Sequence, residues 1–574
     1  MKKFLIGLVA GLLLAGLSVL IFIFSLARLG ERAPSVSDGS TLIIKLRGEI
    51  PEKPGVEIPI PFLAEPAKVT VRDVWAMLRN AAADSRIKAV ILMPEGVDAG
   101  WAKLQEMHDD LLQFKKSGKP LIAYLKYPKT REYYLATAAD RVYMAPEDML
   151  DMKGLRAELT FFKGTLDKLG VNVEVYHVGK YKDFGDMFTQ TAASPATREV
   201  MDSILDSLYG HMIETFAAAR KKTPEQMRAI LDDGPYTAKQ ALKHGLVDAL
   251  LYEDEAYGEM KDRLKQTELT KLAHSEYAKI SGVPLGVEGK KKIALLVGDG
   301  TISRGEEGNG IGSDEGFVSG PFIKLLRKVG SDPDIRGVIL RVDSPGGDAI
   351  ASDEMLREVK LLSKKKPLVI SMSDLAASGG YYVAMTGDPI IAYPNTYTGS
   401  IGIVYGKLNL RGLYDKLGVT KEIMTRGKNA DLDTDYHPLT EAGKKKLKDS
   451  LDEFYVGFVS KAAEARKKKY DELEPLAQGR VWLGSQAKNN GLIDELGGID
   501  KAIEMVKKRA NIAEGEKIQL VPYPGKRNIF EQWMRMSTDS GVDARIKALL
   551  GGLDYKAWAR GGMMRLMPFS IRVE

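Results

Sequence analysis

A serine flanked by small residues stands in the second half of the chain, within the sequence AASGG at residues 376–380. The apolar run PLVISM (367–372) precedes it and YYVAM (381–385) follows, which predicts a buried strand, a sharp turn and a helix. Such a junction exposes a small nucleophile at a helix N-terminus, where backbone amides point outward. Ser378 is therefore a candidate nucleophile, although a serine here could also serve only as a helix cap.

A pair of glycines follows another apolar run of the same half. The segment DSPGGD, Asp343–Asp348, comes directly after GVILRV (337–342). Consecutive glycines after a strand can present N–H groups to a developing oxyanion, so Gly347 and the amide of Gly379 are candidates for an oxyanion hole. A simple turn would explain the Pro-Gly-Gly sequence equally well.

The chain repeats itself at a nearly constant spacing, which predicts two copies of one domain. The matching pairs are DSRIKAVIL (84–92) with DPDIRGVIL (332–340), Tyr133–Tyr134 with Tyr381–Tyr382, DKLGV (167–171) with DKLGV (415–419), and AxxxGLxD (241–248) with AxxxGLxD (487–494). The first three pairs share an offset of 248 residues and the last has an offset of 246.

The two copies differ where chemistry is expected. At the offset of 248, Ser378 falls on Thr130, and the glycines of DSPGGD fall on Asp98 and Ala99. Lys182, within GKYKD (179–183), shows the opposite pattern because Ala430 stands at its place in the second copy. A composite site at the junction of the copies explains why each copy keeps only one part.

A lysine acts as a general base only when it is neutral. Its free pKa of about 10.4 must fall by a few units, and burial in an apolar pocket has that effect. A serine–lysine pair is a known variant of the serine nucleophile theme. We therefore pair Lys182 with Ser378, with the alternative that Lys182 is an ordinary surface lysine.

The elements that must position these residues alternate between strands and helices. Short apolar runs at 292–297, 337–342 and 367–372 are separated by helical patterns, which favours an α/β fold of parallel βαβ units in both copies. A long amphipathic helix is predicted near 440–468. The expected divisions are a stalk at 28–40, an N-terminal repeat domain at 41–280, a linker at 281–291, a C-terminal repeat domain at 292–525 and a tail at 526–574.

The N-terminus predicts a membrane anchor. A short cytoplasmic segment, residues 1–3, precedes an uncharged apolar run at 4–27. Such a run spans about 36 Å as a helix, enough to cross a bilayer of about 30 Å. A cleaved signal peptide, the alternative, has a shorter apolar region. A short N-terminus usually stays inside, so we expect a single-pass protein with its catalytic body outside the cytoplasm.

Composition excludes several other classes of function. The chain has 574 residues and no cysteine, which rules out disulfides, thiolate catalysis and cysteine-bound zinc. Its 83 basic and 77 acidic residues leave a net charge of +6, too weak over this length to indicate nucleic-acid binding. The histidines lie outside the usual metal and hydrolase motifs, so we expect neither a metal nor a cofactor.

Taken together, the anchor, the tandem copies and four motifs resemble the long, double-domain form of signal peptide peptidase A. The motifs are VDSPGGD (342–348), DLAASGGYYVA (374–384), TGSIGI (398–403) and GKYKD (179–183), and Ala430 stands where the short form of the family has its lysine. The resemblance implies a Clp/crotonase-like fold, Ser378 as nucleophile, Lys182 as base, Ser400 as the residue that orients the lysine, and Gly379 and Gly347 as oxyanion donors. It also implies hydrolysis of remnant signal peptides at the inner (cytoplasmic) membrane, with the body on the periplasmic side, by a homo-oligomer, a tetramer in the long form.

Two other functions remain open at this point. A crotonase-like thioester enzyme would share the fold and the oxyanion glycines but would need neither the serine–lysine pair nor an anchor. A membrane-tethered scaffold that has lost activity would need no intact Ser378 and Lys182. The sequence does not decide whether Lys182 meets the serine of its own chain or of a neighbouring subunit.

Overall fold

The computed structural model describes residues 35–55, 68–305, 316–525 and 562–567, together with Gly7, Gly11, Leu14 and Ser18. The predicted anchor at 4–27 therefore lies mainly outside the described residues, as does most of the tail. Among the described residues, no helix is both long enough and apolar enough to cross a bilayer.

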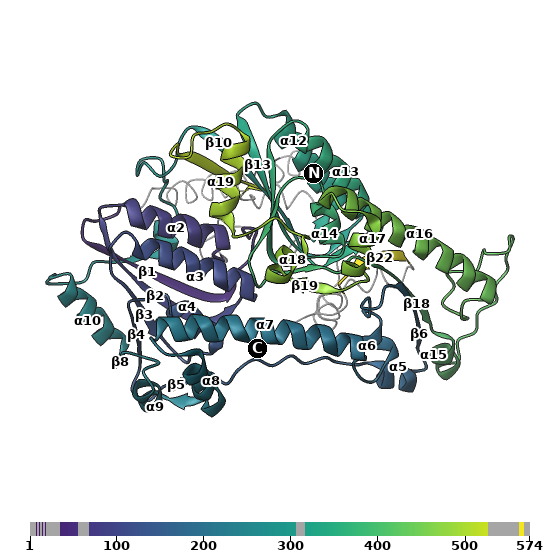
Figure 1. Ribbon diagram of the computed structural model, residues 1–574, viewed down its shortest axis with the longest axis horizontal. Helices are drawn as coiled ribbons and strands as arrows, with labels where there is room; N and C mark the ends of the chain where they lie inside the picture. Colours follow the sequence, from purple (N-terminus) through teal and green to yellow (C-terminus); the bar gives the residue numbers. More distant parts are fainter. Residues whose placement is uncertain are drawn as a thin grey trace.

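The first half of the chain is built on a parallel sheet, drawn in purple and blue in Figure 1. In pairing order its strands are β8 (Ala249–Leu250), β4 (Arg141–Met144), β3 (Leu121–Leu125), β2 (Ile87–Asp98), β1 (Ser40–Glu49) and β9 (Lys271–Ala273). Helices α2 (Val71–Ala83), α3 (Trp101–Lys115) and α4 (Thr130–Ala136) connect β1 to β4 in βαβ succession. All five residues of β3 are buried, as expected for an apolar strand covered on both faces.

The second half repeats this plan. Its sheet has the order β19 (Val481–Leu483), β17 (Tyr397–Gly399), β15 (Leu368–Ala377), β13 (Ile335–Ser344), β10 (Lys291–Asp299) and β21 (Ile518–Tyr523), with β16 (Ile390–Ala392) and β20 (Glu495–Leu496) branching from β15. Helices α12 (Ser319–Ser331) and α13 (Ala349–Ser363) connect β10 to β13 and β13 to β15. The three predicted apolar runs lie in β10, β13 and β15, and the prediction of an α/β fold with parallel sheets is confirmed.

A third sheet joins the two halves. Its order is β12 (Phe317–Val318), β11 (Ile302–Ser303), β14 (Gly346–Asp348), β22 (Gly562–Leu566), β18 (Ile403–Asn409) and β6 (Asn172–Val178). Strand β6 comes from the first half and runs antiparallel to β18 over the full length of both strands. Backbone pairing therefore fixes a segment of the first half against the second half.

Helices complete the connection between the halves. The long helix α7 (Pro195–Ala219) runs across the lower part of the view in Figure 1, from the first half towards α6. It is bound there by Gln486 of α18 (Gly484–Asn490), whose Nε2 donates to Ser203 Oγ at 2.9 Å. The predicted helix near 440–468 is α16 (Glu441–Arg466), which buries Leu447, Leu451 and Phe458 in the core of the second half.

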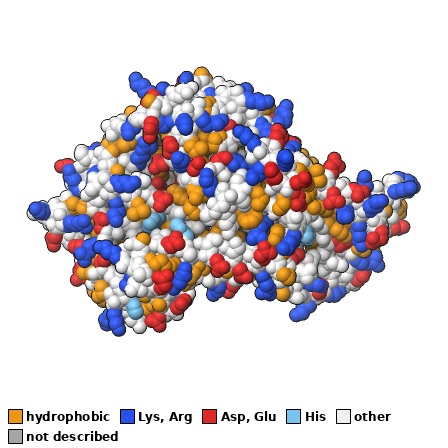
Figure 2. Space-filling model, in the orientation of Figure 1, with side chains coloured by type: hydrophobic (Ala, Val, Ile, Leu, Met, Phe, Trp, Pro, Cys, Tyr) orange, Lys and Arg blue, Asp and Glu red, His pale blue; other side chains and the backbone are white. Residues whose placement is uncertain are grey.

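The remaining elements lie around these sheets. They are β5 (Met149–Leu150), β7 (Tyr236–Thr237), α5 (Lys163–Leu169), α6 (Asp186–Thr189), α8 (Pro224–Asp233), α9 (Ala238–Lys243), α10 (Glu253–Arg263), α11 (His274–Tyr277), α14 (Gly379–Ala384), α15 (Arg411–Leu417), α17 (Tyr470–Leu473), the 3₁₀ helix η1 (Glu474–Leu476) and α19 (Ile499–Arg509). Figure 2 shows acidic and basic side chains interspersed over the visible face, in keeping with the small net charge.

Candidate active site

Ser378 stands between the last residue of β15 and the first residue of α14. Its backbone adopts φ +54° and ψ −111°, a conformation that costs a non-glycine residue about 1–3 kcal/mol and is most often found at functional sites. The Ser378 amide donates to Gly399 O at 2.8 Å, and the Tyr382 amide donates to Ser378 O at 2.8 Å. These bonds fix the backbone of Ser378, whose side chain is fully buried.

Lys182 reaches this serine from the other half of the chain. The pairing of β6 with β18 sets Val178 opposite Ile403, so the loop after β6 lies beside the residues that precede β18. The Tyr181 amide donates to Gln478 O at 2.8 Å and anchors the loop there. The Nζ atom of Lys182 then lies 2.8 Å from Ser378 Oγ within a single chain.

The amine of Lys182 has two further partners, both on Ser400. Nζ lies 2.8 Å from Ser400 Oγ and 2.9 Å from Ser400 O. A neutral amine has two N–H groups and one lone pair. Two donated bonds to Ser400 and one bond accepted from the hydroxyl of Ser378 would use all three, which is the arrangement a general base requires.

Burial favours the neutral form of this lysine. Lys182 is fully buried, and desolvation holds its pKa well below the usual range. The neighbouring Asp183 opposes that shift and the Arg565 guanidinium adds to it. Desolvation outweighs the effect of Asp183, whose own pKa is raised by burial to about 6.

The candidate oxyanion donors lie beside the serine. A Cβ atom added to Gly379 would lie 3.1 Å from the Gly347 nitrogen, and one added to Gly346 would lie 2.5 Å from the Gly379 nitrogen. The amides of Gly379 and Gly347 are therefore neighbours. Gly346 also has φ +97°, and its added Cβ would lie 1.9 Å from Arg565 O, so only glycine fits there.

A strand of the C-terminal tail lies against these glycines. In β22, Arg565 pairs with Gly347 and Leu566 with Gly346 in antiparallel register, and the Met567 amide donates to Pro345 O at 2.9 Å. The Arg565 guanidinium is buried over the Tyr382 ring, 3.6 Å from its centroid. No sequence pattern indicates this placement, because the tail has no counterpart in the first copy.

The structure thus brings Ser378, Lys182, Ser400, Gly379 and Gly347 together. Sequence reasoning missed Arg565 and a group of buried charges behind β13 and β15, described below. Within the described ranges, no three His, Asp or Glu side chains are grouped as metal ligands would be.

Acyl transfer to a serine requires a nucleophile, a base in contact with it and donors for the oxyanion. Here the α/β scaffold collects candidates for all three around the end of β15, and a protein of this construction is a serine hydrolase. The model of peptidase family S49 matches this chain twice, at residues 113–267 and 360–513. The chain belongs to peptidase family S49 and is a serine protease of the SppA type.

Three relatives resemble nearly the whole chain. The chloroplastic serine protease SPPA of Arabidopsis thaliana is 35% identical over 543 residues, covering 93% of this chain and 78% of the relative. Protease 4 of Salmonella typhi is 31% identical, covering 82% and 76%. Protease 4 of Haemophilus influenzae is 30% identical, covering 79% and 75%. Because the chain is a serine protease of a peptidase family, this function is favoured over the two alternatives, a thioester enzyme and an inactive scaffold.

Two solved structures, both of mutant proteins, align with part of the chain. A ClpP1 mutant from Listeria monocytogenes is 12% identical with a TM-score of 0.22, covering 36% of this chain and 94% of that structure. A mutant of 1510-N, a membrane-bound stomatin-specific protease, is 14% identical with a TM-score of 0.26, covering 41% and 98%.

Proposed function

We propose that this protein is a membrane-anchored endopeptidase that hydrolyses remnant signal peptides after their release from preproteins, with Ser378 as nucleophile and Lys182 as general base. The observation that carries the mechanism is the 2.8 Å separation of Lys182 Nζ and Ser378 Oγ, with both side chains fully buried. The matching of family S49 to both halves of the chain supports the peptidase activity.

In this mechanism the neutral amine of Lys182 takes the proton of Ser378 as Oγ attacks the scissile carbonyl. The tetrahedral oxyanion is bound by the amides of Gly379 and Gly347. The lysine ammonium, held by both oxygens of Ser400, protonates the leaving amine. Water activated by the same amine then hydrolyses the acyl-enzyme.

An extended peptide would bind where β22 lies. That strand occupies the space between β14 and β18 and pairs with both, so the groove accepts a chain in β conformation next to Ser378. Addition of a peptide as an extra strand gives affinity through main-chain bonds, which suits unfolded peptides of varied sequence. The apolar run at 4–27, proposed as the anchor, would hold the site near peptides released into the inner membrane and raise their effective concentration.

The repeat also supports a homo-oligomer. At the offset of 248, β6 corresponds to residues 420–426 of the second half and β18 to residues 155–161 of the first half. Among the described residues neither segment forms a strand, although Ala157 takes part in a single β-bridge, and Ile423 and Met424 are exposed. If 420–426 of one subunit pairs with 155–161 of the next, each junction between subunits copies the β6–β18 junction. Head-to-tail contacts generate a ring when the rotation between neighbouring subunits closes, and the tetramer that the family resemblance implies would be such a ring.

The catalytic proposal is tested by hydrolysis of a synthetic signal peptide by the full-length protein in detergent. Ser378→Ala and Lys182→Met should each lower kcat by at least roughly a thousandfold. Lys180→Met is the matched control, because Lys180 is an exposed lysine two residues away whose Nζ contacts Tyr181 and Glu199 instead of the serine. Undiminished cleavage by Lys182→Met would exclude the dyad.

The assembly proposal is tested separately by light scattering after size-exclusion chromatography. Ile423→Pro removes an N–H that strand pairing needs and should dissociate the oligomer. The control is Leu242→Lys, which changes an exposed apolar residue on α9 outside the proposed interface and should leave the oligomer intact. A proline is not used at this position because it would disturb the helix. An Ile423→Pro protein with the wild-type mass would rule out this interface.

A further inference from the structure

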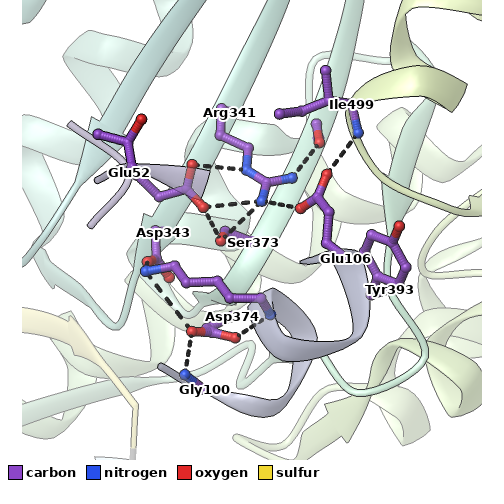
Figure 3. Close-up of polar contacts among 12 residues, drawn as sticks. Glu52, Gly100, Glu106, Arg341, Asp343, Ser373, Asp374, Tyr393 and Ile499 are labelled. Carbon is purple, nitrogen blue, oxygen red and sulfur yellow. Dashed lines mark hydrogen bonds and ion pairs between the residues drawn. The ribbon is translucent and has the colours of Figure 1, made fainter. Parts of the chain in front are cut away.

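A second buried lysine of the first half lies behind the catalytic strands of the second half. Lys103 is on α3, and only 10% of its side chain is exposed. Its Nζ lies 2.7 Å from Asp343 Oδ2 and 3.8 Å from Asp374 Oδ2. Both carboxylates are labelled in Figure 3. These carboxylates stand on β13 and β15, the strands that lead to the oxyanion glycines and to Ser378.

Asp374 also binds the N-terminus of α3. Its Oδ2 accepts from the Gly100 amide and its Oδ1 accepts from the Lys103 amide, each at 2.8 Å. Gly100 is the N-cap residue and has no side chain of its own to cap the helix. The carboxylate of the other half therefore satisfies two amides that a helix leaves unpaired, at the end where negative charge is favourable.

Asp343 holds the two strands together where their regular pairing is interrupted. The β13–β15 ladder is regular as far as Val342 and then shifts register, so that Ser344 lies opposite Ala376. At this shift the Leu375 amide donates to Asp343 Oδ1 at 3.0 Å. Asp343 is three residues before Gly346, and Asp374 is four residues before Ser378.

A further ion pair extends the contact between the halves. The fully buried Arg341 guanidinium of β13 binds Glu52 at 2.9 Å and contacts Glu106 of α3 (Figure 3). Although burial alone would lower the pKa of Lys103, Asp343 and Asp374 raise it above the usual range. Lys103 therefore remains a cation, whereas Lys182, the other buried lysine that the first half contributes here, is driven to the neutral form.

The comparison of the two copies shows that the contact of Lys103 with Asp343 and Asp374 has no counterpart in which the roles of the copies are exchanged. At the offset of 248, Lys103 corresponds to Ala351, Asp343 to Glu95 and Asp374 to Lys126. Glu95 pairs with Arg47 at the surface, and Lys126 is exposed. The charges thus follow the same one-copy pattern as the serine and lysine of the active site.

We propose that Lys103 is a positioning residue of this peptidase: its ammonium binds the strand ends before the oxyanion glycines and before Ser378, and fixes them relative to each other. The inference rests on Ser378 being the nucleophile. It adds that the first half supplies two lysines with different roles. The neutral Lys182 transfers the proton, and the charged Lys103 positions the strand ends. A misplacement of reacting groups by about 1 Å can cost roughly a hundredfold in rate, so the effect should fall on kcat.

The test replaces the ion pair by a neutral pair of similar size. Lys103→Met alone would leave buried carboxylates unpaired, which is strongly destabilising, so it is combined with Asp343→Asn. We expect kcat for signal-peptide hydrolysis to fall about 10–100-fold with KM within twofold. Acylation of Ser378 by a serine-directed probe should slow by the same factor. A folded double variant with wild-type kcat would overturn the proposal.

Two comparisons separate positioning from general destabilisation. Leu104→Ala removes a buried apolar side chain next to Lys103 on α3 and leaves the ion pairs of Lys103 with Asp343 and Asp374 in place, so it should lower the melting temperature with kcat unchanged. If the double variant does not fold, Asp374→Asn, which is isosteric and keeps an acceptor for one amide, is judged by the same criterion. Ser378→Ala is assayed alongside: if it remained active the proposed nucleophile would be wrong, whereas an inactive Ser378→Ala with a fully active double variant would reject only the positioning role.

Discussion

Removal of the Ser400 hydroxyl isolates one contact of the base. In Ser400→Ala, Lys182 Nζ would keep its bonds to Ser378 Oγ and to the Ser400 carbonyl but lose the 2.8 Å contact with Oγ. A hydrogen bond between neutral groups contributes about 0.5–1.5 kcal/mol, and one to a charged group about 1.5–3 kcal/mol. In the proposed mechanism Lys182 becomes charged as Ser378 attacks, so the hydroxyl should stabilise the transition state more than the ground state by about 1–1.5 kcal/mol.

That difference corresponds to a fall in kcat of about 5–13-fold, with KM little changed. The assay is steady-state cleavage of a fluorogenic signal peptide by the full-length protein across pH. Loss of a partner of the ammonium should also lower the pKa seen in the kcat profile. Thr137→Val, which deletes a buried hydroxyl in the first half, is the control and should leave kcat unchanged. A wild-type kcat in Ser400→Ala, or a change confined to KM, would refute the reasoning.

Two further predictions concern the same groove. Because the base must be neutral and burial lowers the pKa of Lys182, kcat should rise with pH through a midpoint well below that of free lysine and then level off; a rise only near pH 10, about the free value, would show that the amine is not buried. Deletion of residues 562–574 should open the groove: if β22 is favoured by about 1.4 kcal/mol, about a tenth of sites are open, and KM should fall about tenfold. The midpoint should also rise, because Arg565 lowers the pKa of Lys182. A higher KM would instead make β22 part of the peptide-binding surface.

Several features followed from the sequence alone because they depend on local pattern or on the internal repeat. Apolar runs bounded by glycine and proline determined β10, β13 and β15, and small residues around Ser378 determined the turn between β15 and α14. The comparison of one copy with the other singled out Lys182, because the copy that contains Ser378 has Ala430 in the corresponding position. The same comparison could have singled out Lys103, whose counterpart is Ala351.

Other features were decided only in three dimensions. The approach of Lys182 to Ser378 depends on the pairing of β6 with β18, which joins residues more than two hundred positions apart. The pairing of β22 with β14 beside Gly347 likewise cannot be predicted from local sequence, because any extended segment can pair with a free strand edge. Charge state was also decided there: lysines are alike in sequence, and only their surroundings make Lys182 neutral through desolvation and Lys103 charged through Asp343 and Asp374.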